Sequence, residues 1–221
     1  LTAFNAVNVV MATGGPGAMY KISVWPEHQI GSHGLALEIG AKANNVTELQ
    51  YGLASTGFRW NLSGTYQQVI PDYFSVDSCG KDKRYFLHDY FDHMGTMATN
   101  IFLKGYQWPF HSERLQDNGS SVIDIAVHNE ITAGRTVFMD FMKNPTPSEN
   151  MKEFSFDLLS AEAADYLKRS GALQDTPYER LAHMNQPAID IYTEHDIDLW
   201  SEPLEIAVCA QHMNGGFAID K

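Results

Sequence analysis

Residues 6–17 read AVNVVMATGGPG, and this stretch decides the fold that the sequence predicts. A short apolar run rich in valine stops abruptly at residues 14–17, which is typical of a buried strand that enters a glycine-rich turn. A buried strand needs neighbouring strands on both sides. We therefore expect the neighbours of this strand to lie outside the chain.

The last part of the chain, Leu204 to Asp220, shows a matching pattern. Two apolar runs flank Asn214-Gly215-Gly216, a turn signal that predicts a terminal β-hairpin. The chain ends just as this second sheet begins. The sequence therefore predicts one complete domain that lies between two interrupted sheets.

The region between the two ends has patterns of both helices and strands. Apolar spacing, capping residues and terminal glycines predict helices over 32–43, 85–104, 121–133, 160–170 and 176–195. β-branched and aromatic residues between turn signals predict strands over 46–54, 66–76 and 136–142, with Pro71 at an edge or a bend. The helix over 32–43 is expected to be short and buried. The predicted fold class is α+β.

The composition of the chain limits its partners and its compartment. It has 15 basic and 27 acidic side chains among 221 residues, so its formal charge is −12 and no nucleic-acid partner is expected. No apolar run reaches the roughly 20 residues of a membrane-spanning helix, so no transmembrane segment is expected. Cys79 and Cys209 have neither disulfide-scaffold nor metal-site spacing, and a reducing cytoplasm fits them best.

Histidines next to carboxylates are the first candidates for chemistry. Both residue types bind metals in phosphohydrolases. Two of the histidines are five positions apart, so on a helix they would point in different directions. We expect no bound metal, and a metal-dependent phosphohydrolase stays an alternative function. The doublets are His88-Asp89, Asp92-His93 and His195-Asp196.

Glycine-containing segments are the second candidates. The turn at residues 14–17 can present backbone N–H groups to a phosphate. Residues 31–34, GSHG, and residues 211–216, QHMNGG, would let a backbone approach a flat ligand. His212 in the second segment can donate a proton to an anionic substrate.

These segments, taken in chain order, resemble one family. Residues 12–15 read ATGG, residues 32–41 read SHGLALEIGA and residues 211–217 read QHMNGGF. They resemble the A-T-G-G strand end, the T-G-D-G helix and the H-Y-x-M-G-G-I segment of the flavoprotein subunits of fumarate reductase, succinate dehydrogenase and L-aspartate oxidase. The resemblance covers the whole chain, although each motif is short.

The resemblance implies a domain organisation. Residues 1–30 would end the first segment of an FAD-binding α/β domain, and residues 204–221 would begin its second segment. Residues 31–203 would form a capping domain of helices packed on a small mixed or antiparallel sheet, whose entry helix, 31–43, can pack with the FAD-binding domain. The chain would then be an internal fragment with short stubs of the FAD-binding domain at both ends.

The resemblance also implies a cofactor and site residues. FAD is implied for the parent protein, and we expect this chain alone not to retain it, because most contacts with the cofactor would lie outside the chain. The implied cofactor-binding residues are Ala12, Thr13, Gly14, Gly15, Ser32, His33 and Gly34. The implied catalytic residues, on the substrate side, are His212, Gln211 and Arg59.

The sequence departs from the family pattern where the chemistry occurs. The family's R-G-E-G-G arginine has no counterpart near residues 69–74, and Arg59 is the nearest candidate. Counted back from Gly215, Gln211 occupies the position of the family's substrate histidine, and His212 follows one residue later. A shift of one residue on a regular strand turns a side chain to the opposite face. His33 replaces the flavin-contacting acid.

The predicted function is that of a fragment of an FAD-dependent oxidoreductase, which transfers hydride between flavin and a small polar or carboxylated substrate. The fragment alone is expected to be inactive, and succinate or fumarate activity is not expected without the arginine. The expected partners are the remainder of the FAD-binding domain and an electron-transfer protein. A non-enzymatic module for packing or partner docking is the other alternative.

Overall fold

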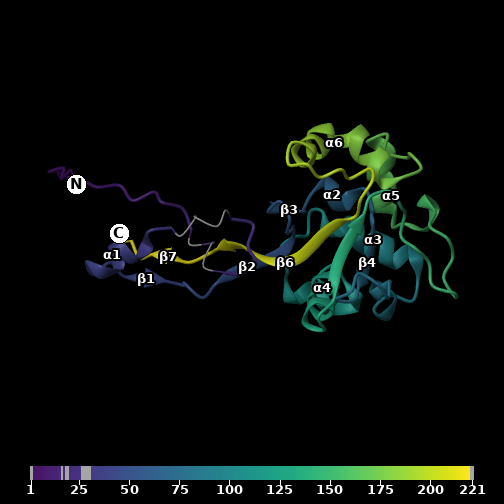
Figure 1. The fold of residues 1–221 in the computed structure, drawn as a ribbon, viewed down its shortest axis with the longest axis horizontal. Coiled ribbons are helices and arrows are strands. Elements are labelled where there is room, and N and C mark those ends of the chain that lie inside the picture. The colour runs from purple at the N-terminus through teal and green to yellow at the C-terminus, as the bar shows by residue number, and fades with distance from the viewer. Residues whose placement is uncertain (1, 16, 18–19, 26–30, 220–221) are drawn as a thin grey trace.

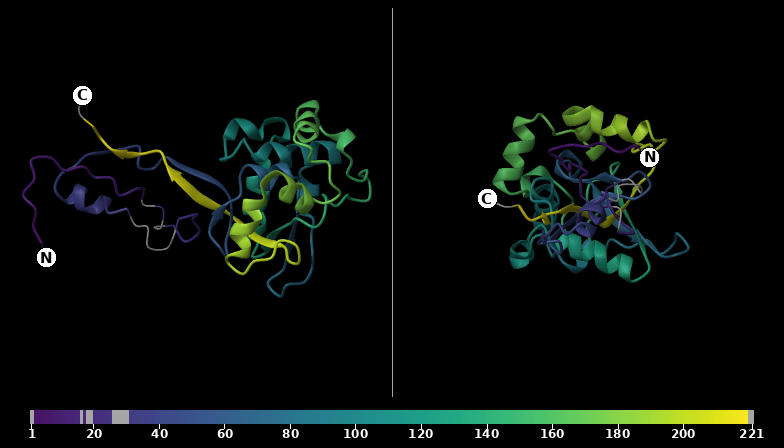
Figure 2. Two further views of the ribbon diagram at one scale, coloured as in Figure 1. Left: turned by 90° about the horizontal axis from the view of Figure 1, so that it is seen from above. Right: turned by 90° about the vertical axis from the view of Figure 1, so that its left-hand side faces the viewer.

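The structure of the protein is a computed structural model, and it describes residues 2–15, 17, 20–25 and 31–219. A globular part and an elongated part are visible in Figure 1 and in the left view of Figure 2. We call the globular part, built around a five-stranded sheet, the head. Residues 2–15, 31–48 and 214–219 form the arm, and residues 49–52 and 209–213 form the neck that joins the two.

The sheet of the head is antiparallel throughout, with the strand order β3-β2-β6-β5-β4. β4 is an edge strand, and Pro71 lies directly before it, where its missing N–H removes no ladder hydrogen bond. The expected edge position of this proline is confirmed. The strands are β2 (Leu49–Ser55), β3 (Trp60–Asn61), β4 (Asp72–Val76), β5 (Thr136–Asp140) and β6 (Leu204–Met213).

Helices complete the head and confirm the α+β class. α4 packs against β5 and β6, whereas α2 contacts both α3 and α6. The helices are α2 (Thr65–Gln68), α3 (Met94–Lys104), α4 (Val122–Thr132), α5 (Ala161–Arg169) and α6 (Pro177–Thr193). Short 3-10 turns lie at Phe86–Asp89, Ser112–Asn118 and Phe156–Leu158.

The core of the head lies between these helices and the sheet. Its members are apolar side chains that are almost completely buried, and they come from every main segment of the head. Burial of such side chains is the dominant favourable term in folding. The largest include Tyr73, Tyr192, Phe86, Phe91, Phe102, Phe141, Leu62, Ile70, Ile101 and Ile123.

Five predicted elements are confirmed. The expected helices over 121–133, 160–170 and 176–195 correspond to α4, α5 and α6, and the expected strands over 46–54 and 136–142 correspond to β2 and β5. Gly171, with φ +66°, follows α5 as a helix-ending glycine does. α6 starts with a capping box between Thr176 and Glu179, and it bends at Asn185, just before Pro187.

Two predicted elements of the head are shorter than expected. The helix over 85–104 is a 3-10 turn followed by α3, because His93 has an extended backbone between them. The strand over 66–76 begins as helix α2, and only Asp72–Val76 is extended. Ile70 between them has φ +56°, since Pro71 disfavours the right-handed helical conformation of the preceding residue.

The expected terminal hairpin is wrong. Beyond Asn214-Gly215 the chain continues into β7 (Gly216–Phe217), which pairs with β1 (Ala43–Asn44) and not with β6. The two segments approach so closely that a Cβ on Gly215 would lie 2.0 Å from the Asn45 carbonyl oxygen. The glycine is therefore required by a backbone contact and not by a reversal of the chain.

Two further expectations for the arm are also wrong. Residues 2–15 contain no strand, and Val7, Val9 and Val10 are 85–99% exposed. The helix expected over 32–43 is only α1 (His33–Glu38), and none of its residues is buried. Both segments are apolar enough to be buried, but in the described part of the chain no other element covers them.

Candidate functional site

The predicted substrate-side residues meet at the neck, around Trp25. The Trp25 indole Nε1 donates to the Gln211 carbonyl oxygen at 2.9 Å. The Trp25 carbonyl oxygen accepts from Arg59 Nη1 at 3.2 Å. One tryptophan therefore joins a residue of the turn between β2 and β3 to a residue of β6, although 152 positions separate them in sequence (211 − 59).

His212 lies on the exposed side of the neck between two indole rings. Its ring centroid is 5.6 Å from that of Trp108 and 6.4 Å from that of Trp25. The segment that carries Trp108 is fixed to the neck because Phe110 N–H donates to the Tyr51 carbonyl at 2.7 Å. The imidazole is thus both accessible and held by aromatic contacts, which suits a proton donor to a bound molecule.

Gln211 is buried, so it differs from its exposed neighbour His212. Its side chain Nε2 donates to the Leu53 carbonyl at 3.1 Å, while its Oε1 is buried without a hydrogen-bond partner in the described chain. The structure therefore does not bring the Gln211 carboxamide and the His212 imidazole to one surface.

Cys209 lies two residues before Gln211, in a part of the neck from which solvent is excluded. Burial raises the pKa of the Cys209 thiol to about 12, and the opposing effect of the Arg59 charge is smaller. Thiolate is the nucleophilic form of cysteine. Cys209 is therefore an inert core residue and no candidate nucleophile.

The predicted cofactor residues lie in the arm, in two places. Ser32, His33 and Gly34 line an open hollow of about 750 Å³ with Gly216 and Phe217. The His33 and Phe217 rings lie 5.1 Å apart between centroids.

The Gly-rich segment 12–15 lies elsewhere in the arm. It is mostly exposed, and Thr13 donates to the Gly31 carbonyl. Gly15 lines a small hollow together with Trp25, Gln211 and His212. The structure thus brings one of the four predicted residues to the neck. Pro16, part of the predicted turn, lies outside the described residues.

Arg59 is bonded to the Trp25 carbonyl next to the neck, and a second arginine contacts the region of residues 69–74. A different arginine, Arg180 of α6, donates to the Val69 carbonyl from both Nε and Nη2, at 3.0 and 2.8 Å. Arg180 is completely buried, and burial lowers its pKa to about 10. It stabilises the interior of the head and has no access to the exposed face of His212.

The His–Asp doublets do not form a metal site. His88 Nε2 is bonded to the Thr146 carbonyl, and His195 stacks on Phe58 with ring centroids 3.7 Å apart. Among the residues that the structure describes, no three His, Cys, Asp or Glu side chains lie together as metal ligands would.

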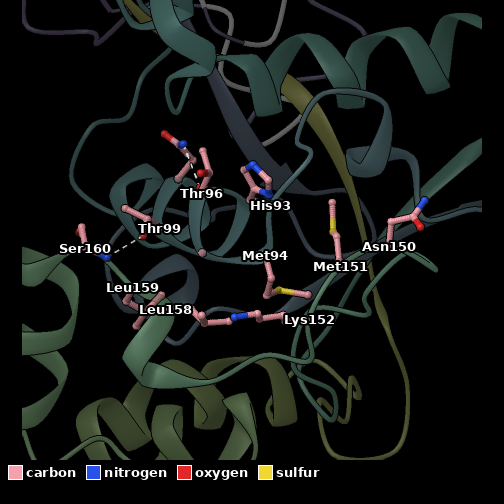
Figure 3. Close-up of a pocket in the computed structure, with 12 residues that line it drawn as sticks. His93, Met94, Thr96, Thr99, Asn150, Met151, Lys152, Leu158, Leu159 and Ser160 are labelled. Atoms are coloured by element: carbon pink, nitrogen blue, oxygen red, sulfur yellow. Dashed lines mark hydrogen bonds between the residues drawn. The ribbon is translucent and has the colours of Figure 1, made fainter.

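A second hollow lies on the head, at the start of α3. His93, Thr96 and Thr99 line it together with Asn150 and Lys152 (Figure 3), and the hollow has a volume of about 620 Å³. Ser160 N–H donates to Thr99 Oγ1 at 3.0 Å and closes one side. Only His93 of this group was singled out from sequence.

Trp25 and Trp108 are the residues of the neck that sequence analysis missed. Their role depends on contacts with Gln211 and His212 of β6, each more than 100 positions away in sequence. The available signal was the tryptophan–proline pair at residues 108–109, because the residue before a proline is restricted in its backbone conformation.

Comparison with known proteins supports the fold. No family model matches the chain, and no curated protein matches it. A solved structure described as "Quinol-Fumarate Reductase with Menaquinol Molecules" matches with a TM-score of 0.51 and 17% identity. The likeness shows the fold. It covers 95% of this chain, while this chain spans only 30% of the length of the matched chain.

The likeness supports the sequence interpretation at the level of architecture. The α+β head, with helices on an antiparallel sheet, is a capping-domain fold like that in the fumarate reductase structure. None of the described helices has the length and apolar character needed to cross a membrane.

Proposed function

We propose that this chain is the substrate-side part of an FAD-dependent oxidoreductase. In this proposal the parent protein transfers hydride between flavin and a small polar or carboxylated substrate, with His212 at the substrate. Residues 31–203 form the capping domain in this proposal, and residues 1–30 and 204–221 belong to the FAD-binding domain. The observation that carries the proposal is the meeting of Arg59, Gln211 and His212 around Trp25 in the neck.

The arm has features that fit a flat cofactor. A Cβ on Gly34 or Gly216 would meet no atom within 4 Å, so a ligand can approach both backbones. His33 Nδ1 is buried, and no described residue forms a hydrogen bond with it. Ser32, His33, Gly34 and Phe217 are therefore the residues proposed to hold FAD. The cofactor would supply the hydride chemistry.

The chain's own residues bind, orient and supply a proton. His212 donates a proton to the substrate from its exposed imidazole, while Trp108 and Trp25 limit the orientations of the ring. Arg59 adds positive charge near the neck and favours a carboxylated substrate. Because residues 69–74 contain no counterpart of the family's proton-delivering arginine, fumarate and succinate are not the proposed substrates.

The full-length protein tests this proposal. Its reduced flavin should be reoxidised anaerobically by a panel of small conjugated acids and ketones, and fumarate should be among the slow members. His212→Phe should slow the fastest reaction by about 10² or more, with an unchanged flavin spectrum. His195→Phe, which alters a histidine at the end of α6, is the control and should leave the rate unchanged.

Three results would contradict parts of the proposal. A flavin-free full-length protein would favour a module for packing or partner docking. A His212→Phe variant with the parent rate would remove His212 from the reaction. Fast fumarate reduction would overturn the expectation about the substrate.

A further inference from the structure

The pairing of β2 with β6 is irregular at one position in the neck. Gln50 pairs with His212, but the next residue, Tyr51, pairs with Ala210. Gln211 has no partner on β2 and is the extra residue of a β-bulge. Such bulges change the direction of neighbouring side chains and are frequent next to active sites.

Three contacts hold the extra residue. Gln211 Nε2 donates to the Leu53 carbonyl, and the Gln211 carbonyl accepts from the Trp25 indole. The carboxamide lies directly over Gly52, where a Cβ would be 2.9 Å from Nε2. The absence of a side chain at position 52 therefore provides the room in which the Gln211 carboxamide packs.

The bulge has a direct consequence for the next residue. Cys209, Ala210 and Gln211 are buried in succession, whereas His212 is exposed against Trp108. Regular alternation would turn every second side chain to the same face. Because Gln211 is held by both its side chain and its carbonyl, the direction of the His212 backbone is fixed as well.

We propose that Gln211 is a positioning residue, which as the extra residue of the bulge holds the His212 imidazole between Trp25 and Trp108. Gly52 and Trp25 contribute to the same arrangement, because Gly52 leaves room for the Gln211 carboxamide and Trp25 donates to the Gln211 carbonyl. The inference rests on the proposed function for its meaning in catalysis. The arrangement itself can be measured in this chain without flavin.

The test is NMR spectroscopy of the chain with labelled histidine, in which His212→Asn assigns the His212 signals. The parent chain should show nuclear Overhauser effects between His212 and the Trp108 ring. Gln211→Met keeps the length of the side chain but loses its hydrogen bond to Leu53, and Gly52→Ala displaces the carboxamide. Both variants should lose most of these effects and shift the ring signals of His212.

Two further variants make the result decisive. Trp25→Phe removes one N–H donor and keeps an aromatic ring. It should also shift the His212 signals, and it serves as the test if Gln211→Met and Gly52→Ala do not fold. Gln68→Met changes another buried glutamine, in α2, and should lower stability without moving these signals. Unchanged His212 signals in folded Gln211→Met, Gly52→Ala or Trp25→Phe chains would overturn the inference.

The full-length protein then separates this inference from the proposed function. Gln211→Met should lower kcat by about 10-fold to 100-fold with little change in KM, because the proton donor is displaced. Loss of the His212 contacts without a change in kcat would keep the positioning role and reject its catalytic meaning. If the full-length protein contains no flavin, the proposed function is contradicted, but the NMR result on the position of His212 in this chain is unaffected.

Discussion

At the scale of single residues, position in the sheet decides which groups are available for chemistry. Gln211 and His212 are neighbours in sequence, yet the Gln211 carboxamide is buried in the neck, whereas the His212 imidazole is exposed next to two indole rings. Cys209 shows the same effect, since a thiol on the same strand is buried and protonated. Residue type alone did not distinguish these cases.

Thiol labelling tests the burial of Cys209. Burial raises the pKa of its thiol to about 12, so the thiol is almost entirely neutral at pH 8, and it is also buried. Cys79 is exposed. Iodoacetamide at pH 8 should therefore label one thiol per native chain, and Cys79→Ser should remove that reaction. Fast labelling of the folded Cys79→Ser variant would show that the neck is open.

A buried ion pair provides a second prediction at this scale. Lys104 and Asp124 form an ion pair with side chains only 1% and 2% exposed, and burial lowers the pKa of Lys104 and raises that of Asp124. Lys104→Met leaves the Asp124 carboxyl group buried without a cation, and should lower the free energy of unfolding by about 3–5 kcal/mol. Urea unfolding measures this change.

The double variant is the control for the ion pair. Lys104→Met combined with Asp124→Leu should be more stable than Lys104→Met alone, because no uncompensated charge stays buried. A double variant whose loss equals the sum of the two single losses would contradict this explanation.

At the scale of elements, a helix was predicted correctly where its own sequence contains the residues that start and end it. α5 and α6 have capping residues, a terminal glycine or a first-turn proline, and both were predicted. The helix over 85–104 is interrupted, because the backbone of His93 is extended and Tyr90 is held by hydrogen bonds from Asn118 and Asn129. The hairpin failed because its glycine serves the contact with Asn45, which lies on a distant segment.

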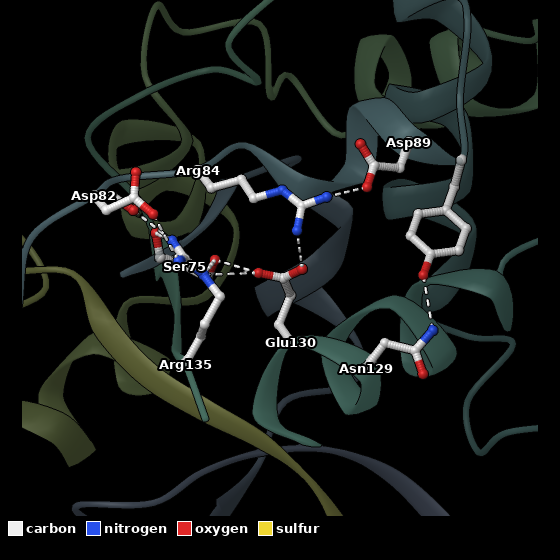
Figure 4. Close-up of polar contacts among 8 residues, drawn as sticks. Ser75, Asp82, Arg84, Asp89, Asn129, Glu130 and Arg135 are labelled. Atoms are coloured by element: carbon white, nitrogen blue, oxygen red, sulfur yellow. Dashed lines mark hydrogen bonds and ion pairs between the residues drawn. The ribbon is translucent and has the colours of Figure 1, made fainter. Parts of the chain in front are cut away.

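A charged network joins several elements of the head. Figure 4 shows Glu130 of α4 between Arg84 and Arg135, with ion-pair distances of 2.9 and 3.1 Å. Arg135 also pairs with Asp82, at 2.9 Å. The network attaches the loop after β4 to α4 and to the start of β5.

The network predicts unequal effects for its two acids. Glu130 is buried between both arginines, so Glu130→Gln should lower the free energy of unfolding by about 2 kcal/mol. The Asp82 side chain is 74% exposed, so Asp82→Asn should change it by less than about 0.5 kcal/mol. Urea unfolding of both variants checks this order, and a larger effect of Asp82→Asn would refute it.

At the scale of the whole molecule, the sequence predicted the architecture of the head better than the structure of the arm. The α+β class follows from patterns that are complete within the head. The valine-rich run at residues 6–13 has the pattern of a buried strand, but in the described chain it is exposed and has no β partner. The arm carries apolar surface on Leu35, Leu37 and Val46, which further protein could cover.

The isolated chain should therefore bind flavin weakly. Its proposed cofactor residues line one open hollow in the arm and provide few contacts. Dialysis of the 221-residue chain after mixing with FAD should remove the cofactor completely. Stoichiometric FAD after dialysis would show that the cofactor site is complete within this chain.

The flavin content of the full-length protein tests the central proposal most directly. Purified full-length protein should contain about one FAD per chain, seen as absorbance near 450 nm and released on denaturation. Full-length, folded protein without flavin, which also fails to bind added FAD, would contradict the proposal.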